Sequence, residues 1–208
     1  MGDSLFGSDE EDEPSASLPI EGAYHFPALL SEEIQSEALQ KVAAFTGASN
    51  QCMLWGQEAE TLAAPLLRVL PDLLRPTLPE DVYALLFDSG LTLQVIVNLY
   101  EPGEGITPHV DLLSRYGDGI LGVSFLSSAL MQFHEDDQLQ ASVLLRPGDV
   151  YILSGSARYD YKHGIPFQLV DTYTEEGIEK TLVRGRRISI TLRRMLQGAD
   201  QLGFLDSH

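Results

Sequence analysis

A histidine and an aspartate stand two positions apart in the stretch Thr-Pro-His-Val-Asp, where they are His109 and Asp111. At the start of a strand, side chains at positions i and i+2 leave the same face, so these two can reach one ion. A histidine combined with a carboxylate suits a metal of intermediate softness. Such pairs also arise by chance in loops, so the pair alone indicates a metal site without establishing one.

A third ligand has to come from another part of the chain, and His163 is the best placed of the remaining histidines. It follows an expected strand and precedes Gly-Ile, well separated from Asp111. Two histidines and one carboxylate on one side of an ion leave three coordination positions open, as in non-haem iron(II) oxygenases. We therefore predict an iron site formed by His109, Asp111 and His163. The histidines with less suitable surroundings are His25, His134 and His208.

The last apolar run, Arg-Arg-Ile-Ser-Ile-Thr-Leu-Arg-Arg, alternates polar and apolar residues. With a period of two, its polar face consists of Arg187, Ser189, Thr191 and Arg193. If this face points inward, its arginines need anionic partners, such as Asp111 or an organic acid that fits the planar fork of a guanidinium. If it points outward, the run is an ordinary edge strand with its charges in water. Alternation alone leaves both interpretations open.

Short β-branched runs dominate the chain from residue 91 onward. Turn-forming stretches rich in glycine, proline and acidic residues separate them, and no helical pattern lies between them. This pattern is typical of a double-stranded β-helix, also called a jelly roll, and not of a doubly wound sheet. The eight runs are 91–100, 120–126, 129–134, 141–147, 150–155, 167–173, 181–185 and 187–194.

The region before residue 91 is expected to be helical. Ser31 predicts the start of an amphipathic helix that ends near Gly47, and a short helix is expected around Glu80–Phe87. Between them, Glu58–Leu78 has leucines at helical spacing, but its prolines predict short, separate helical pieces. Trp55 is expected in the core between two helices. The prolines are Pro65, Pro71 and Pro76. We predict an α+β fold with N-terminal helices packed on the jelly roll.

The N-terminal head is strongly acidic, with six acidic residues among the first thirteen. We expect a disordered tail over residues 1–18 and one folded domain over residues 19–208. The acidic residues of the head are Asp3, Asp9, Glu10, Glu11, Asp12 and Glu13.

The formal net charge of −18 lowers the expectation of a broad nucleic-acid-binding surface, because such surfaces are usually basic. The single cysteine, Cys52, excludes an internal disulfide framework and fits a reducing compartment. No apolar run approaches the ~20 residues needed to cross a bilayer. The acidic start is neither a secretory signal nor an arginine-rich transit peptide. We expect an intracellular protein of the cytoplasm, the nucleus or both, without a membrane partner.

Several separated motifs occur in order and together resemble the AlkB-like iron(II)/2-oxoglutarate dioxygenases. They are Asn-Leu-Tyr at 98–100, Pro-Gly-Glu-Gly-Ile-x-Pro-His-Val-Asp at 102–111, Ser-Ala-Arg-Tyr-x-Tyr-x-His-Gly-Ile at 156–165 and Arg-x-Ser-x-Thr-x-Arg at 187–193. The similarity runs from about Asn50 to Met195, which is most of the expected domain. It implies a jelly-roll enzyme that uses Fe(II), 2-oxoglutarate as cosubstrate and O2.

The resemblance also implies roles for individual residues. The iron ligands would be His109, Asp111 and His163. Arg187 would pair with the distal carboxylate of 2-oxoglutarate, and Arg193 would lie against Asp111 and the cosubstrate. The implied cosubstrate-binding residues are Asn98, Tyr100, Arg187, Ser189 and Arg193. The implied reaction is hydroxylation of a C–H bond, which on an N-methyl group leads to demethylation with release of formaldehyde.

The substrate side departs from the pattern of base-repairing members. Where these often carry an acidic residue that contacts the base, this chain has Leu113. Leu113, Arg115 and Tyr116 are the residues expected at the substrate mouth, although the glycines after Tyr116 favour a turn over residues 116–119. An insert before the last run could present a local basic rim to a phosphate backbone, or be a solvated hairpin of mixed charge. The rim residues are Lys180, Arg184 and Arg186.

We predict a dioxygenase that demethylates or hydroxylates alkylated or modified nucleic acid, with RNA ahead of DNA. The alternative is the same chemistry on a protein side chain, which the acidic body and Leu113 favour. A third possibility is a catalytically silent β-helix that acts as a binding module. It is disfavoured because no ligand-type residue is missing. The sequence does not determine the substrate, the oligomeric state or the role of the acidic tail.

Overall fold

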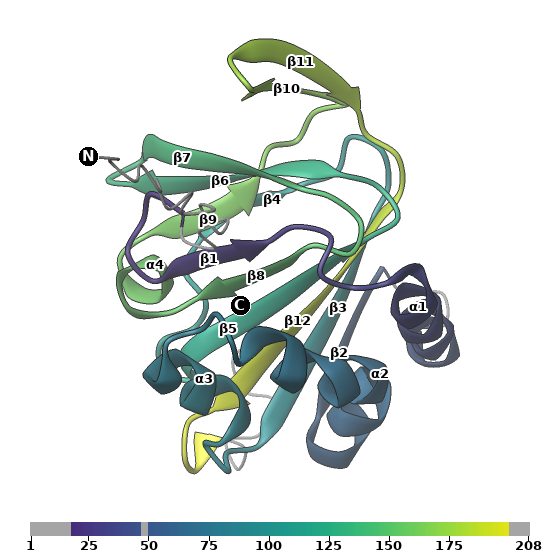
Figure 1. The fold of residues 1–208 in the computed structure, drawn as a ribbon, viewed down its shortest axis with the longest axis vertical. Helices are drawn as coiled ribbons and strands as arrows, with labels where there is room; N and C mark the ends of the chain where they lie inside the picture. The colour runs from purple at the N-terminus through teal and green to yellow at the C-terminus, as the bar shows by residue number, and fades with distance from the viewer. Residues whose placement is uncertain (1–17, 47–49, 200–208) are drawn as a thin grey trace, which may run out of the picture.

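The computed structural model describes residues 18–46 and 50–199, so the expected tail lies almost wholly outside the described residues. Two antiparallel sheets enclose a shared interior, and three helices lie on the outer face of the larger sheet (Figure 1). A two-stranded hairpin projects beyond both sheets at the top of the view. This is the α+β jelly roll that the short β-branched runs predicted.

The larger sheet has six strands in the order β1-β8-β5-β12-β3-β2. They are β1 (Ala23–Phe26), β2 (Gln51–Trp55), β3 (Leu93–Tyr100), β5 (Tyr116–Phe125), β8 (Val150–Leu153) and β12 (Arg187–Met195). The smaller sheet has the order β4-β9-β6-β7. Its strands are β4 (Ile106–His109), β6 (Ala129–Glu135), β7 (Gln138–Leu145) and β9 (Lys162–Ile165). The projecting hairpin consists of β10 (Val170–Glu175) and β11 (Ile178–Val183).

Strand β12 is central in the larger sheet, because it pairs with β3 on one side and β5 on the other. Its apolar face packs with the core under the helices and consists of Ile188, Ile190 and Leu192. Its polar face lines the pocket between the sheets and consists of Arg187, Ser189, Thr191 and Arg193. The inward interpretation of the last run is therefore confirmed. The edge-strand interpretation is wrong, because a strand with two paired neighbours has no free edge.

The helices are α1 (Glu32–Thr46), α2 (Gly56–Leu74), α3 (Glu80–Phe87) and α4 (Gly155–Tyr159). Helix α1 begins directly after Ser31, whose hydroxyl accepts a hydrogen bond from the Ile34 amide at 3.4 Å, so the predicted helix start is confirmed. The predicted helix at Glu80–Phe87 is also confirmed. None of the helices in the described part of the chain is both long and apolar enough to span a membrane.

Helix α2 is one continuous helix, so the predicted interruption by prolines is wrong. Pro65 and Pro71 lie inside it, and only Pro76 lies beyond its end. A proline in a helix interior costs about 3 kcal/mol, whereas complete burial of a leucine side chain contributes about 1.5–3 kcal/mol. Burial on the sheet therefore matches or outweighs the cost of two prolines. The fully buried leucines of this helix are Leu62, Leu66, Leu70 and Leu74.

Four strands were not expected from the sequence: β1, β2, β4 and β9. Three of them have four residues and one has five, which is too short for alternation to be recognised. The eight expected runs all form strands. The turn expected over residues 116–119 is wrong, since β5 already begins at Tyr116. Gly119 is part of this strand and has a φ of +80°.

Trp55 also differs from its predicted environment. It ends β2, and its side chain packs against a small cluster formed by Tyr116, Met195 and Ala199. The expected position between two helices is therefore wrong. The local sequence has apolar residues on both sides of Trp55, so only the sheet pairing decides which face the indole occupies.

Candidate metal centre and its pocket

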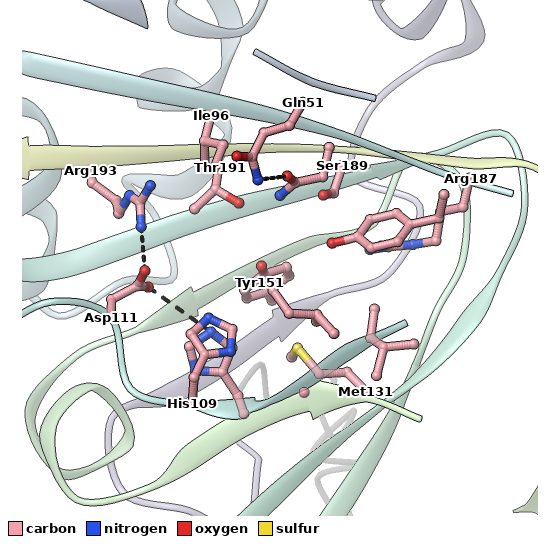
Figure 2. Close-up of a pocket in the computed structure, with 16 residues that line it drawn as sticks. Gln51, Ile96, His109, Asp111, Met131, Tyr151, Arg187, Ser189, Thr191 and Arg193 are labelled. Atoms are coloured by element: carbon pink, nitrogen blue, oxygen red, sulfur yellow. Dashed lines mark hydrogen bonds and ion pairs between the residues drawn. The ribbon is translucent and has the colours of Figure 1, made fainter. Parts of the chain in front are cut away.

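A pocket lies between the two sheets and is lined by side chains from both (Figure 2). The larger sheet contributes the polar face of β12 together with Asn98 and Tyr100 of β3. The smaller sheet contributes His109 of β4 and His163 of β9. Asp111 lies just beyond β4 at the same end of the pocket. The predicted metal and cosubstrate residues thus come from four strands and the stretch just after β4, and they meet in one cavity.

The two histidines are direct cross-strand partners. Strand β4 pairs antiparallel with β9, and His109 stands opposite His163 in the register. Their ring centroids are 4.6 Å apart. Side chains that face each other across adjacent antiparallel strands share one side of the sheet, so both imidazoles are presented to the pocket.

The surroundings of each imidazole determine which nitrogen it can offer to a metal. Burial above all, and then the neighbouring His109, lowers the pKa of His163 to about 4, so its ring is neutral. His109 Nδ1 lies 2.9 Å from the main-chain oxygen of Thr107. A proton on Nδ1 donates this hydrogen bond and leaves Nε2 as the acceptor nitrogen. Hydrogen bonds of this kind set the tautomer and the ring orientation of metal-binding histidines.

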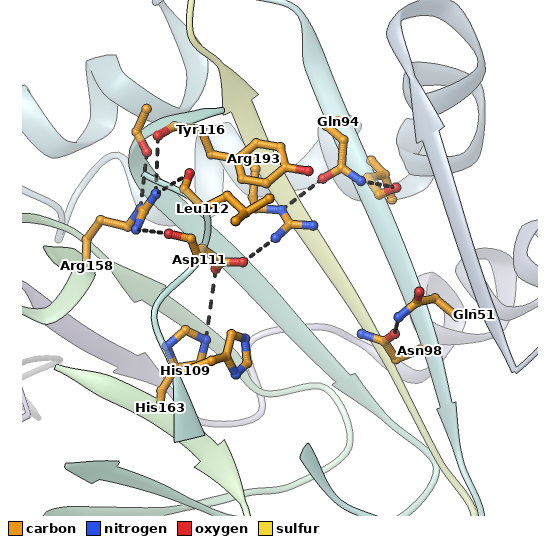
Figure 3. A network of polar contacts seen from close by, with 12 residues as sticks. Gln51, Gln94, Asn98, His109, Asp111, Leu112, Tyr116, Arg158, His163 and Arg193 are labelled. Atoms are coloured by element: carbon orange, nitrogen blue, oxygen red, sulfur yellow. Dashed lines mark hydrogen bonds and ion pairs between the residues drawn. The ribbon is translucent and has the colours of Figure 1, made fainter. Parts of the chain in front are cut away.

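Asp111 is a buried carboxylate held by a guanidinium. Burial raises its pKa, but the charge of Arg193 in particular outweighs this and keeps the pKa below its usual value. Arg193 Nη1 donates to Asp111 Oδ1, and its Nε donates to Gln94 Oε1 at 2.9 Å. The other oxygen, Oδ2, lies 4.0 Å from His163 Nε2. One edge of the carboxylate is thus fixed by Arg193 and the other faces the imidazoles (Figure 3).

The donor set fits iron(II) in kind: two imidazoles and one ionised carboxylate face a common space. No three His, Cys, Asp or Glu donors within residues 18–46 and 50–199 already stand in a metal-binding arrangement. Because Arg193 holds only Oδ1, the oxygen nearest the histidines keeps its lone pairs available. The residues present therefore fit the ion by donor type and charge.

Arg187 lies at the opposite end of the pocket and has an unused donor. Its Nε donates to the Ser124 hydroxyl at 3.0 Å, and its guanidinium carbon lies 5.4 Å from the Tyr100 ring centroid. Its Nη1 is buried and has no hydrogen-bond partner. Burial lowers the pKa of this guanidinium, and the nearby Tyr100 and Tyr151 oppose that effect. A buried cation with an unpaired donor is the environment that an organic carboxylate would complete.

The remaining predicted cosubstrate residues line the same pocket. Ser189 is buried, and Asn98 accepts a hydrogen bond at its Oδ1 from Gln51 Nε2 at 2.7 Å. Tyr100 flanks Arg187. All five predicted cosubstrate residues therefore line one pocket, and their individual roles stay predictions.

Residues 56–193 match the family described as the 2OG-Fe(II) oxygenase superfamily. This chain belongs to that superfamily. The matched range includes both histidines, the aspartate and the polar face of β12.

Curated relatives of this oxygenase include AlkB homologues. One is the mitochondrial alpha-ketoglutarate-dependent dioxygenase alkB homolog 7 of Bos taurus, 40% identical over 56% of this chain and 53% of that protein. Another is the tRNA (carboxymethyluridine(34)-5-O)-methyltransferase ALKBH8 of Macaca fascicularis, 31% identical over 50% of this chain and 18% of that protein. The oxygenase chain therefore spans about half the length of the cattle relative. These matches place it beside the AlkB-like proteins.

A solved structure shows the same fold. The protein OsALKBH1 superimposes with a TM-score of 0.52 at 14% identity, covering 83% of this oxygenase and 98% of that chain. At this identity the similarity concerns the fold alone. It agrees with the jelly roll and the helical layer described above.

The residues predicted at the substrate mouth separate into exposed and buried positions. Leu113 is 56% exposed and Leu112 is 53% exposed, and both follow Asp111 directly. Arg115 is half-buried. Tyr116 is 4% exposed and lies under the Arg193 guanidinium at 4.1 Å, so its predicted contact with substrate is wrong. Tyr116 is the first residue of the central strand β5, and its ring points into the protein.

The residues of the predicted basic rim each have a carboxylate partner in the described structure. Arg184 is 5% exposed and pairs with the buried Asp171 at 2.6 Å, so its assignment to a rim is wrong. Lys180 pairs with Glu175 at 2.6 Å, and Arg186 pairs with Glu101 at 2.7 Å. The cations of the insert are each matched by a carboxylate, which charge counting along the sequence does not reveal.

Three residues in the pocket wall or behind it were not singled out from the sequence. Tyr151 of β8 lines the pocket, and its ring lies over Gly122 of β5, where an added Cβ would stand 2.1 Å from a ring carbon. Gln94 orients Arg193, and Arg158 contacts the loop after Asp111. The only sequence signal was the position of Arg158 inside the motif that ends in His163. The positions of Tyr151 and Gln94 at the site depend on cross-strand pairing alone.

Proposed function

We propose that this chain is an Fe(II)- and 2-oxoglutarate-dependent dioxygenase that oxidises a C–H bond of its substrate. The observation that carries the proposal is one pocket with metal-type donors at one end and a buried, unpartnered guanidinium donor at the other. When bound there, iron with 2-oxoglutarate and O2 supplies the oxidising chemistry, and the protein supplies position and electrostatics.

The side chains of the pocket have complementary tasks in this proposal. His109, Asp111 and His163 hold the metal, and Arg193 keeps the carboxylate ionised and oriented. Arg187 binds the distal carboxylate of 2-oxoglutarate through the donor that has no partner among the described residues. Tyr100 and Tyr151 wall this end of the pocket, so the ion pair with the cosubstrate would be sheltered from water.

The direct test is anaerobic titration of the protein with iron(II) and 2-oxoglutarate. We expect a metal-to-ligand charge-transfer absorption band, followed on exposure to O2 by slow succinate production without a prime substrate. A protein that binds iron but shows neither the band nor succinate would contradict the proposal.

Substitution of Arg187 tests the cosubstrate anchor. We expect Arg187→Met to raise the KM for 2-oxoglutarate about 100-fold, because a charge-assisted bidentate contact contributes a few kcal/mol in a buried site. Arg187→Lys should recover part of the loss, since it restores the charge without the fork. Turnover is measured as succinate release, with iron affinity as the control. An unchanged KM in both variants would exclude this role.

For the substrate, we propose a modified nucleic acid, with RNA ahead of DNA, and oxidative demethylation or hydroxylation as the reaction. The support is the similarity to AlkB homologues, one of which carries tRNA in its name. The second candidate is a polypeptide side chain. It is favoured by the ion pairs that occupy Lys180, Arg184 and Arg186.

Salt dependence separates these two candidates. Among the described cations beside the Asp111 loop, Arg115 is half-buried and has no carboxylate partner, whereas Arg158 and Arg193 are buried. Binding of a methylated RNA oligonucleotide should therefore weaken with salt with a slope near −0.7, corresponding to about one phosphate contact on a single strand. Fluorescence anisotropy at several salt concentrations measures the slope, and Arg115→Gln should flatten it. If the protein does not bind the RNA oligonucleotide even at low salt, the nucleic-acid candidate is excluded and the polypeptide candidate remains.

An intracellular location is part of the proposal and is supported by the single cysteine. The cattle relative carries "mitochondrial" in its name, a compartment that the expectation of cytoplasm or nucleus did not include. We propose one oxygenase domain over residues 19–208. This proposal does not include a role for the acidic tail or an oligomeric state.

A further inference from the structure

Arg158 is a buried cation whose hydrogen bonds all go to the main chain. It lies on the short helix α4, and only 2% of it is exposed. Its guanidinium donates to main-chain carbonyl oxygens and to no carboxylate in the described structure. Burying a guanidinium is costly, so its retention needs a reason beyond filling space.

The carbonyls that Arg158 contacts all belong to the segment that follows the metal-binding motif. Nη1 donates to Asp111 O at 3.0 Å, and Nη2 donates to Tyr116 O at 3.2 Å and Leu112 O at 3.5 Å. Nε donates to Gly117 O at 3.3 Å. One side chain therefore fixes both ends of the loop 112–116, as Figure 3 shows for the labelled residues.

The position of Arg158 in the chain links the two halves of the metal site. It precedes His163 by five residues on the segment from α4 into β9, whereas its partners belong to the segment that carries Asp111. A second contact joins the same segments, since the Gly155 amide donates to the Asp118 carboxylate at 3.1 Å. Hydrogen bonds thus join the segment that carries His163 to the main chain of the segment that carries Asp111.

We propose that Arg158 is a positioning residue for the metal centre: it holds the Asp111 main chain and the adjoining loop at a fixed place relative to His163. This inference rests on the proposed function. It follows that the exposed Leu112 and Leu113, which lie inside the fastened loop, are presented at a fixed place beside the pocket.

Metal affinity provides a readout that a general loss of stability would not reproduce. Partners outside the ligand shell typically change metal affinity 10–100-fold when removed. We expect Arg158→Met to weaken Mn(II) binding, measured by electron paramagnetic resonance, by about this factor. Arg158→Lys should weaken it less, because the ammonium keeps the charge but contacts fewer carbonyls.

Arg194 offers a matched control. It is also an arginine that donates only to main-chain carbonyls, those of Leu86 at 2.9 Å and Leu91 at 3.1 Å, but these lie at α3 and not at the pocket. Arg194→Met should lower the melting temperature and leave Mn(II) affinity unchanged. Hydrogen exchange gives a metal-free readout: the amides of Arg115 and Tyr116 should exchange faster in Arg158→Met and not in Arg194→Met.

The outcomes separate this inference from the proposed function. If Arg158→Met folds and binds Mn(II) as well as Arg194→Met does, the positioning role is overturned while the proposed function stands. If Arg158→Met does not fold, Arg158→Lys becomes the test variant. The positioning role is then overturned if Arg158→Lys has the Mn(II) affinity and the amide exchange of the parent protein. If the parent protein binds neither Mn(II) nor Fe(II), the proposed function fails and this inference fails with it.

Discussion

Replacing His163 with alanine is expected to abolish 2-oxoglutarate turnover, with a loss of at least about 100-fold, because even partners outside a ligand shell cost 10–100-fold. His109→Ala should have the same effect, since the two imidazoles face each other across β4 and β9. Neither change leaves a buried charge unpaired, so the fold should survive. Succinate release and Mn(II) affinity are measured side by side, and both should fall.

His25 is the control for these two variants. Its Nε2 bonds to the buried Asp149 at 2.9 Å, outside the pocket, so His25→Ala should reduce stability and leave turnover per folded molecule unchanged. Asp111→Ala is a less specific test, because it also removes the carboxylate partner of the buried Arg193. If His163→Ala and His109→Ala bind Mn(II) and release succinate as well as the parent, the assignment of the metal ligands is wrong.

Replacing Arg184 with methionine should cost about 3–5 kcal/mol of unfolding free energy, because it leaves a buried charge without its counterion. Asp171 is fully buried and receives two hydrogen bonds from Arg184, at 2.6 Å each. Its further donors, the Leu130 amide and Gln168, do not carry a charge. The pair fastens the base of the β10–β11 hairpin to β6. Urea denaturation measures the loss.

Two comparisons define this prediction. Arg186→Met breaks an ion pair whose side chains are 64% and 58% exposed, so it should cost less than about 1 kcal/mol. Arg184→Met combined with Asp171→Asn should be more stable than Arg184→Met alone, because it removes the stranded charge. Equal losses for Arg184→Met and Arg186→Met would contradict the argument.

The pH dependence of this pair has a definite sign. Burial raises the pKa of Asp171, but the hydrogen bonds from Arg184, Gln168 and Leu130 outweigh it and hold the pKa below its usual value. A carboxylate with a lowered folded-state pKa stabilises the protein above its unfolded pKa and loses that contribution as the pH falls through the folded one. Asp171→Asn should therefore reduce the steepness of acid unfolding.

The sequence by itself determined the type of most elements and indicated many of the residues that line the pocket. Alternation in residues 187–194 separates a polar face from an apolar one before any neighbour is known, because side chains in a strand alternate between faces. The order of the motifs indicated His109, Asp111, His163 and Arg187 together. These are local properties, since each depends on residues that are close in the chain.

Only the tertiary structure decided that the polar face of β12 points into the pocket, that α2 is continuous and that the cations of the insert have carboxylate partners. Arg184 looks like a surface cation until Asp171 is found beside it, and Pro65 looks like a helix break until the leucines around it are buried. Arg158 reaches a loop more than forty residues earlier. Each outcome depends on burial and on partners far apart in the chain, and no local pattern of residues specifies those.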